Sequence, residues 1–128
     1  MPDRKAYDIL LIMAEKDLRA LSNMLNSEIF DDEIFGFHAQ QAIEKLFKAW
    51  LAWFDVLFPI THNIGKLYDL ILELDERVIP YKKLAELTEF GVILRYTPLV
   101  TEHETINRNE VIAQVGKLFQ LVKSLSSN

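Results

Sequence analysis

Apolar residues recur at steps of three and four along the first part of the chain. This spacing places side chains on one face of an α-helix, so it predicts an amphipathic helix over about residues 7–25. The residues expected on its inner face are Tyr7, Leu10, Leu11, Ala14, Leu18, Leu21 and Leu25.

A second, longer helix is predicted from about residue 31 to residue 54. Asp31, Asp32 and Glu33 supply a cap and an acidic first turn, both of which favour a helix start. The residues expected on its core face are Phe35, Ala39, Ala42, Ile43, Leu46, Ala49, Trp50 and Trp53.

Three further helices follow from the same periodicity. Thr61 is expected to cap the third helix, and Pro80 to end it or to open a shorter fourth one. Asn107 and Glu110 form a cap pair for the last helix. The inner positions are Ile64, Leu67, Tyr68, Ile71, Leu72 and Leu74 in the third helix, Leu84, Leu87, Phe90, Gly91 and Leu94 in the fourth, and Val111, Val115, Leu118, Phe119, Val122 and Leu125 in the last.

Two short segments offer an alternative reading as strands. Residues 54–60 and 92–97 are rich in β-branched and aromatic side chains. Both are isolated and bounded by proline, so we interpret them as coil or helix ends. The predicted fold class is therefore all-α, an up-and-down bundle of four to five antiparallel helices. With 128 residues and no linker or repeat, the chain is expected to form a single helical domain over residues 1–128.

Composition narrows the class of protein. The chain is 50% hydrophobic with eight Phe, four Tyr and two Trp, which excludes a disordered protein. It has no cysteine, which excludes a disulfide framework and a thiolate zinc site. A net charge of −5 excludes a broad basic footprint for nucleic acid, so any such contact would be local.

The chain carries no pattern for export or for a membrane. Its N-terminal residues lack an apolar stretch with a small-residue cleavage site, and no run approaches the roughly 18 apolar residues of a membrane span. We therefore expect a soluble, cytoplasmic protein without a membrane partner.

Asp17 interrupts the apolar face of the first predicted helix. Burial of an unpaired carboxylate costs several kcal/mol or more, so Asp17 should be paired. Lys45 and Arg95 are the candidate partners, because both lie on elements expected to pack near this helix. Asp17 is then either a structural buried ion pair or part of a functional site.

The second predicted helix has a polar side. At about 100° per residue, its polar residues fill one arc of roughly 160°. Phe37 lies inside this arc beside Gln41, where glutamines can pair across a symmetric contact. Phe37 and Gln41 are therefore candidates for a dimer contact, although a single exposed Phe is also ordinary. The polar residues are His38, Gln40, Gln41, Glu44, Lys45, Lys48 and Asp55.

The three histidines do not form a metal site by spacing, so no metal ligand is predicted. His62 follows Thr61 and is interpreted as a helix-start residue. Arg95 and His103 flank Pro98 in a polar loop, where they could hold a phosphate and move a proton. The alternative is a surface loop with two unrelated side chains.

Several segments resemble one known family. The run FHAQQAIEK at residues 37–45, continuing through Lys48, resembles the signature of HEPN domains. AEKDLRA at residues 14–20 resembles the first helix of that family, THNI at residues 61–64 is similar to its T-H-x-L segment, and LRY at residues 94–96 resembles its R-Y-P turn. The resemblance extends over about residues 6–122.

The resemblance implies a helical bundle that commonly dimerises and is proposed to bind nucleotides, and we expect no cofactor. Many prokaryotic members are encoded beside a minimal nucleotidyltransferase, as halves of toxin–antitoxin-like pairs. The expected function is therefore that of a homodimeric, nucleotide-binding partner of such an enzyme, without activity of its own. We assign Arg95, His38 and Lys45 to the nucleotide or its phosphate.

The resemblance also implies two alternatives. Many HEPN proteins are metal-independent endoribonucleases that use an arginine and a histidine a few residues apart. In this chain seven residues separate Arg95 from His103, and the turn reads R-Y-T-P. The first alternative is thus a ribonuclease toxin with Arg95 and His103 as catalytic residues, and the second is a structural dimer without a ligand.

Overall fold

The computed structural model describes residues 2–58, 60–86 and 107–127. Within these ranges the chain is helical and has no strand, which confirms the predicted fold class. The elements in chain order are α1 (Arg4–Ser22), α2 (Asp32–Trp53), α3 (Ile64–Leu72), the 3-10 helix η1 (Glu76–Tyr81), α4 (Lys82–Ala85) and α6 (Arg108–Ser124).

The segment after α2 has irregular backbone where it is described, as the coil interpretation predicts. The other strand candidate, residues 92–97, lies outside the described residues. No helix in the described ranges is long and apolar enough to cross a lipid bilayer.

Most helices begin at a polar side chain that accepts a hydrogen bond from the first turn. Asp3 caps α1, and Asn107 caps α6 through the Glu110 N–H, as the sequence predicts for the last helix. Thr61 is not the cap of α3. That helix begins at Ile64, and the Asn63 side chain accepts from the Lys66 N–H.

The region around Pro80 also differs from the prediction. Pro80 lies inside the 3-10 helix η1, and the α-helix that follows ends at Ala85. The remaining positions of the predicted fourth helix, from Leu87 to Leu94, lie outside the described residues.

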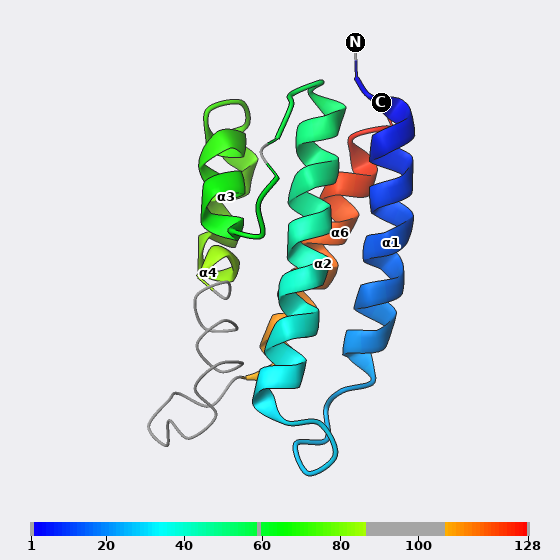
Figure 1. Cartoon of the computed structure of the whole chain (residues 1–128), viewed down its shortest axis with the longest axis vertical. Helices are drawn as coiled ribbons and strands as arrows, with labels where there is room; N and C mark the ends of the chain where they lie inside the picture. The colour runs from blue at the N-terminus through cyan, green and yellow to red at the C-terminus, as the bar shows by residue number, and fades with distance from the viewer. Residues whose placement is uncertain (1, 59, 87–106, 128) are drawn as a thin grey trace.

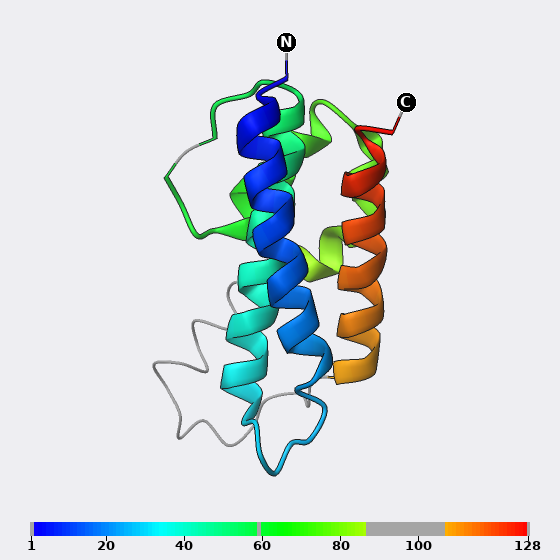
Figure 2. The ribbon, with the colours of Figure 1, turned by 90° about the vertical axis from the view of Figure 1, so that its right-hand side faces the viewer.

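The long helices of the bundle do not simply alternate in direction. The Tyr7 hydroxyl donates to the Val122 carbonyl at 2.6 Å, and the Asp3 N–H donates to the Ala52 carbonyl at 2.9 Å. The start of α1 therefore lies beside the ends of both α2 and α6. Figures 1 and 2 show α2 and α6 running in one direction and α1 in the other.

The connection after α2 returns along that helix before α3 begins (Figure 1). The His62 carbonyl, just before α3, accepts from Gln40 Nε2 at 3.3 Å. Asp75, just after α3, accepts from Trp50 Nε1 at 3.2 Å. Because Gln40 precedes Trp50 in α2, α3 runs in the same direction as α2.

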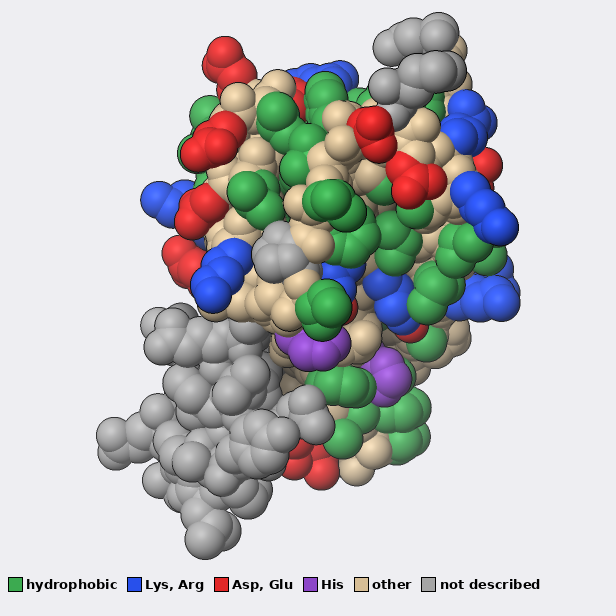
Figure 3. Space-filling view, turned by 45° about the horizontal axis from the view of Figure 1, so that its top comes forward, with side chains coloured by type: hydrophobic (Ala, Val, Ile, Leu, Met, Phe, Trp, Pro, Cys, Tyr) green, Lys and Arg blue, Asp and Glu red, His purple; other side chains and the backbone are tan. Residues whose placement is uncertain are grey.

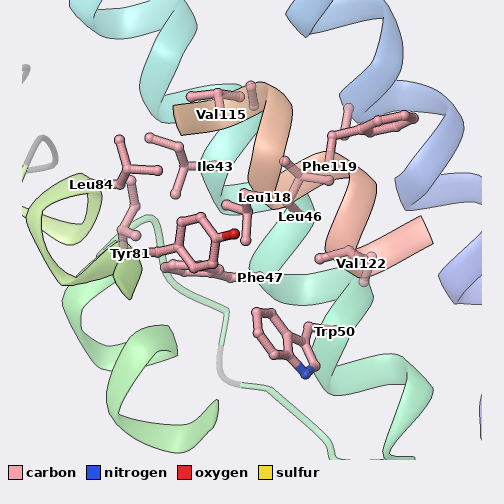
Figure 4. Packing of buried hydrophobic residues seen from close by; sticks show 14 of the residues in the cluster. Ile43, Leu46, Phe47, Trp50, Tyr81, Leu84, Val115, Leu118, Phe119 and Val122 are labelled. Carbon is pink, nitrogen blue, oxygen red and sulfur yellow. The ribbon is translucent and has the colours of Figure 1, made fainter. Parts of the chain in front are cut away.

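The core is built around α2, whose apolar side chains pack on three sides against α1, α3 and α6. Full burial of each large apolar side chain stabilises the fold by roughly 1.5–3 kcal/mol. Figure 4 shows the part between α2, α4 and α6, where its labelled residues are Ile43, Leu46, Phe47, Trp50, Tyr81, Leu84, Val115, Leu118, Phe119 and Val122.

Three residues predicted to face inward are largely exposed instead: Leu25, Leu72 and Leu74. Helix α1 ends at Ser22 and α3 ends at Leu72. Leu25 and Leu74 thus lie beyond the ends of their helices, and Leu72 is in the last turn. The helical periodicity of the sequence extends further than the helices themselves.

Candidate functional site

A strip of polar side chains runs along the side of α2 that is turned away from the core. His38, Gln41, Lys45 and Lys48 follow one another at steps of three and four, and all four are half-buried. Figure 3 shows the two described histidines on one face of the molecule, with basic side chains and apolar groups around them. This strip is the outer part of the polar arc that the sequence predicts.

Two members of that arc are not on the surface. Gln40 and Glu44 are only 4% and 5% exposed. They lie on the side of α2 along which the chain returns toward α3, where both contact His62. The returning chain covers one side of the arc, so its polar residues divide into a half-buried outer strip and a buried pair.

Glu44 is the centre of a small polar cluster. One oxygen of its carboxylate is 2.9 Å from His62 Nδ1, and the other accepts from Lys48 Nζ at 3.4 Å. The carboxylate is almost fully buried, whereas the His62 side chain is 78% exposed. Lys48 Nζ also lies 5.6 Å from the centre of the Phe58 ring, within range of a cation–π contact.

Gln40 holds the same segment through its backbone. Its Nε2 donates to the His62 carbonyl at 3.3 Å. Its Oε1 is buried and has no hydrogen-bond partner among the described residues. A buried acceptor without a partner costs about 1–3 kcal/mol, so such atoms are uncommon.

Asp17 contacts Lys45, one of its two candidate partners. Lys45 Nζ donates to Asp17 Oδ2 at 2.5 Å, and each side chain is about one-fifth exposed. The other candidate, Arg95, lies outside the described residues. Asp17 lies among apolar positions of α1 in the sequence, but its side chain keeps about one-fifth of its surface exposed. It is therefore partly buried and not fully enclosed in the core.

The comparison with known families decides what this bundle is. The model of the family described as HEPN domain matches residues 7–125, nearly the whole chain. The chain belongs to the HEPN family. No curated protein and no solved structure matches it. Membership connects this HEPN domain with nucleotide- or RNA-related functions.

The HEPN resemblance placed a catalytic pair on Arg95 and His103, which are outside the described residues, and the assignment stays a prediction. Arg108, the next arginine after Arg95, is described and has a structural role. Its guanidinium donates to the carbonyls of Met24 and Phe30 at 2.7 and 2.6 Å, and to Asp32 Oδ1 at 2.9 Å.

Phe37 and Gln41, the candidate dimer contact, are half-buried on the same face of the HEPN bundle. The Phe37 ring lies 5.5 Å from the His38 ring, edge to face. Ile34, one turn earlier, is 44% exposed. The start of α2 thus carries apolar surface at its outer side, and the dimer stays a prediction.

Sequence reasoning missed the cluster of Gln40, Glu44 and His62 in this HEPN domain. One signal was available, since Gln40 and Glu44 are four residues apart and so share one side of a helix. The contact with His62 depends on how the chain returns after α2, which periodicity does not describe. No group of three potential metal ligands is present in the described ranges.

Proposed function

We propose that this HEPN protein is a nucleotide-binding accessory subunit of a minimal nucleotidyltransferase, as one half of a toxin–antitoxin-like pair. The observation that carries the proposal is that His38, Lys45 and Lys48 lie on one side of α2, and that His62 and Lys48 contact the same Glu44 carboxylate. All of these residues but His62 belong to α2, in the stretch with the strongest family resemblance.

The two lysines are suited to a phosphate group because their positions are fixed. Lys45 is held by Asp17 and Lys48 by Glu44, with each ammonium group retaining further N–H donors. The ammonium N–H groups that the carboxylates do not use can donate hydrogen bonds to phosphate oxygens. The surface is therefore able to bind a phosphate group locally, although the whole chain is acidic.

The binding test is a titration of ATP into the purified protein, followed by calorimetry. Lys48→Gln is expected to weaken ATP binding about tenfold to 150-fold, which corresponds to the roughly 1.5–3 kcal/mol of one charge-assisted hydrogen bond. Lys45→Gln should act in the same direction. Lys117→Gln, an exposed lysine on α6, is the matched control and should leave binding unchanged.

The partner test is co-expression with a minimal nucleotidyltransferase encoded next to this chain. A stable complex that co-elutes in size-exclusion chromatography supports the accessory role. A chain that binds ATP but never co-elutes with that enzyme would contradict it.

The ribonuclease alternative has a separate outcome. We expect little cleavage of single-stranded RNA by the purified protein in the absence of metal. Robust cleavage that is lost in both Arg95→Ala and His103→Ala would replace the accessory role with that of a ribonuclease toxin. A dimer that binds neither ATP nor RNA would instead favour a structural role.

A further inference from the structure

The pair formed by Glu44 and His62 joins a buried carboxylate to an exposed imidazole. Glu44 is 5% exposed on the side of α2 that the returning chain covers, and the His62 side chain is 78% exposed. Gln40 holds the backbone of the same histidine. His62 is thus fixed at both its backbone and its ring, although it lies in the irregular chain before α3.

The contact with Glu44 determines what the other ring nitrogen presents. A carboxylate accepts hydrogen bonds, so the proton of the 2.9 Å contact belongs to Nδ1 of His62. In a neutral imidazole the lone pair is then on Nε2. No described residue bonds to Nε2, which makes it an oriented hydrogen-bond acceptor on an exposed ring.

Lys48 supplies the complementary group. Its ammonium contacts the other oxygen of the same Glu44 carboxylate. Glu44 therefore positions both a cation, the Lys48 ammonium, and an acceptor, Nε2 of His62. A ligand that fits both carries an anion and a hydroxyl donor a few bonds apart. A phosphate and a ribose hydroxyl of a single nucleotide meet this requirement.

Gln40 adds a second observation at the same place. Its side chain is buried, and its Oε1 lacks a partner among the described residues. Because this oxygen is covered in the structure, it is not open to a ligand, and Gln40 contributes by holding the His62 backbone through its Nε2.

We propose that His62 reads the ribose of the bound nucleotide, an inference that rests on the proposed nucleotide-binding function. Nε2 of His62 accepts a hydrogen bond from a ribose hydroxyl, Glu44 holds the ring in the required tautomer, and Lys48 contacts the phosphate. This face then distinguishes ATP from the analogue that lacks the contacted hydroxyl, and a contact with the 2′-hydroxyl selects ribonucleotides over deoxyribonucleotides.

The test compares the dissociation constants of ATP, 2′-deoxy-ATP and 3′-deoxy-ATP. The protein should prefer ATP over at least one deoxy analogue by about threefold to tenfold, the value of one neutral hydrogen bond. His62→Phe keeps a ring without an acceptor and should remove this preference. His62→Gln, which restores an acceptor oxygen, should recover part of it.

His38→Phe is the matched control, because it removes a histidine from the same face without touching the Glu44 pair. It should leave the ratio between ATP and its analogues unchanged, even if all three bind more weakly. Thermal unfolding of each variant checks that the bundle is intact, which the exposure of His62 leads us to expect.

Two outcomes would overturn the ribose contact while leaving nucleotide binding in place. One is equal affinity of the wild-type protein for all three nucleotides, and the other is a preference that survives His62→Phe. Failure of all three nucleotides to bind would instead refute the proposed function itself.

Discussion

Asp75 connects the end of α3 to the middle of the core through two partners. Its carboxylate accepts from Trp50 Nε1 at 3.2 Å and from the Arg77 guanidinium at 2.7 Å. The hydrogen bond from Arg77 lowers the pKa of Asp75 below its usual range, against the opposing effect of partial burial. The ionised form of Asp75 is therefore the one that the fold favours.

This lowered pKa predicts a pH-dependent stability. The contribution of Asp75 should be complete at pH values above the usual carboxyl pKa of about 4, and lost as the pH falls through the lower folded value. Asp75→Asn should thus cost about 1–3 kcal/mol in urea unfolding at neutral pH, and less at pH 3. The exposed Asp69→Asn is the control, and an equal cost for Asp75→Asn at both pH values would contradict the argument.

The Asp17–Lys45 pair tests how much partial burial strengthens the coupling free energy of an ion pair. A fully buried pair costs about 3–5 kcal/mol when one partner is removed, and an exposed pair contributes below about 1 kcal/mol. With each side chain about one-fifth exposed, a double-mutant cycle to alanine should give a coupling free energy of about 1–2 kcal/mol. The cycle for Arg4 and Asp8, which are half-exposed, should give a coupling free energy of only about 0.3–0.5 kcal/mol. Equal coupling free energies for the two pairs would show that Asp17 is solvated.

At the scale of elements, Arg108 joins the start of α6 to the connection between α1 and α2. It donates to two backbone carbonyls and one carboxylate, and its guanidinium lies 5.0 Å from the centre of the Phe35 ring. A planar fork of donors can reach several acceptors at once, which a lysine ammonium cannot. Arg108 therefore fixes the distance between three segments of the chain.

Arg108→Met should destabilise the protein by about 3 kcal/mol or more, because the carbonyls of Met24 and Phe30 and the Asp32 carboxylate lose a buried partner. Arg108→Lys should recover less than half of this loss. Denaturant unfolding gives the stability, and hydrogen exchange should show the loss concentrated in residues 24–35. Full recovery by lysine would indicate that charge alone matters at this position.

Helix positions were predictable because the apolar periodicity of α1, α2 and α6 is continuous. The residues at which the helices begin and end were harder to predict. Thr61 and Asn63 are both good caps, but the Thr61 hydroxyl accepts from the Asn63 N–H before the helix begins, and Asn63 caps α3. Periodicity also assigned Leu74 to a helix interior, although the chain leaves α3 before that residue.

The outer strip of the candidate site was predictable from a helical projection, which placed His38, Lys45 and Lys48 on one side of α2. The burial of Gln40 and Glu44 was not, because the projection describes one helix in isolation. The chain that contacts them is the segment leading into α3, through the backbone and the ring of His62, and its path is set by tertiary contacts. The polar face of α2 could therefore be predicted from the sequence, whereas the cluster around Glu44, which includes His62 from outside the helix, could not.

At the scale of the whole molecule, the outer side of α2 is also the predicted dimer contact. Phe37→Glu should shift the protein toward a monomer in sedimentation experiments while its helical circular dichroism stays unchanged, since a buried charge at a symmetric contact is repeated on both copies. Gln120→Glu adds the same charge on α6 and should leave the association unchanged. A wild-type protein that is monomeric at high micromolar concentration would refute the dimer.

The hydrogen bonds of Tyr7 carry a consequence for the order of folding during synthesis. Its hydroxyl is bonded to the carbonyls of Val122 and Lys123, and 115 residues separate Tyr7 from Val122 in the chain. The first helix therefore leaves the ribosome long before its partner exists, and α1 can pair only with α2 until α6 is made. Because closing so long a loop costs entropy, we expect this contact to form late in folding. Tyr7→Phe should accordingly speed unfolding in stopped-flow experiments and leave the refolding rate nearly unchanged, whereas slower refolding would show that α6 docks early.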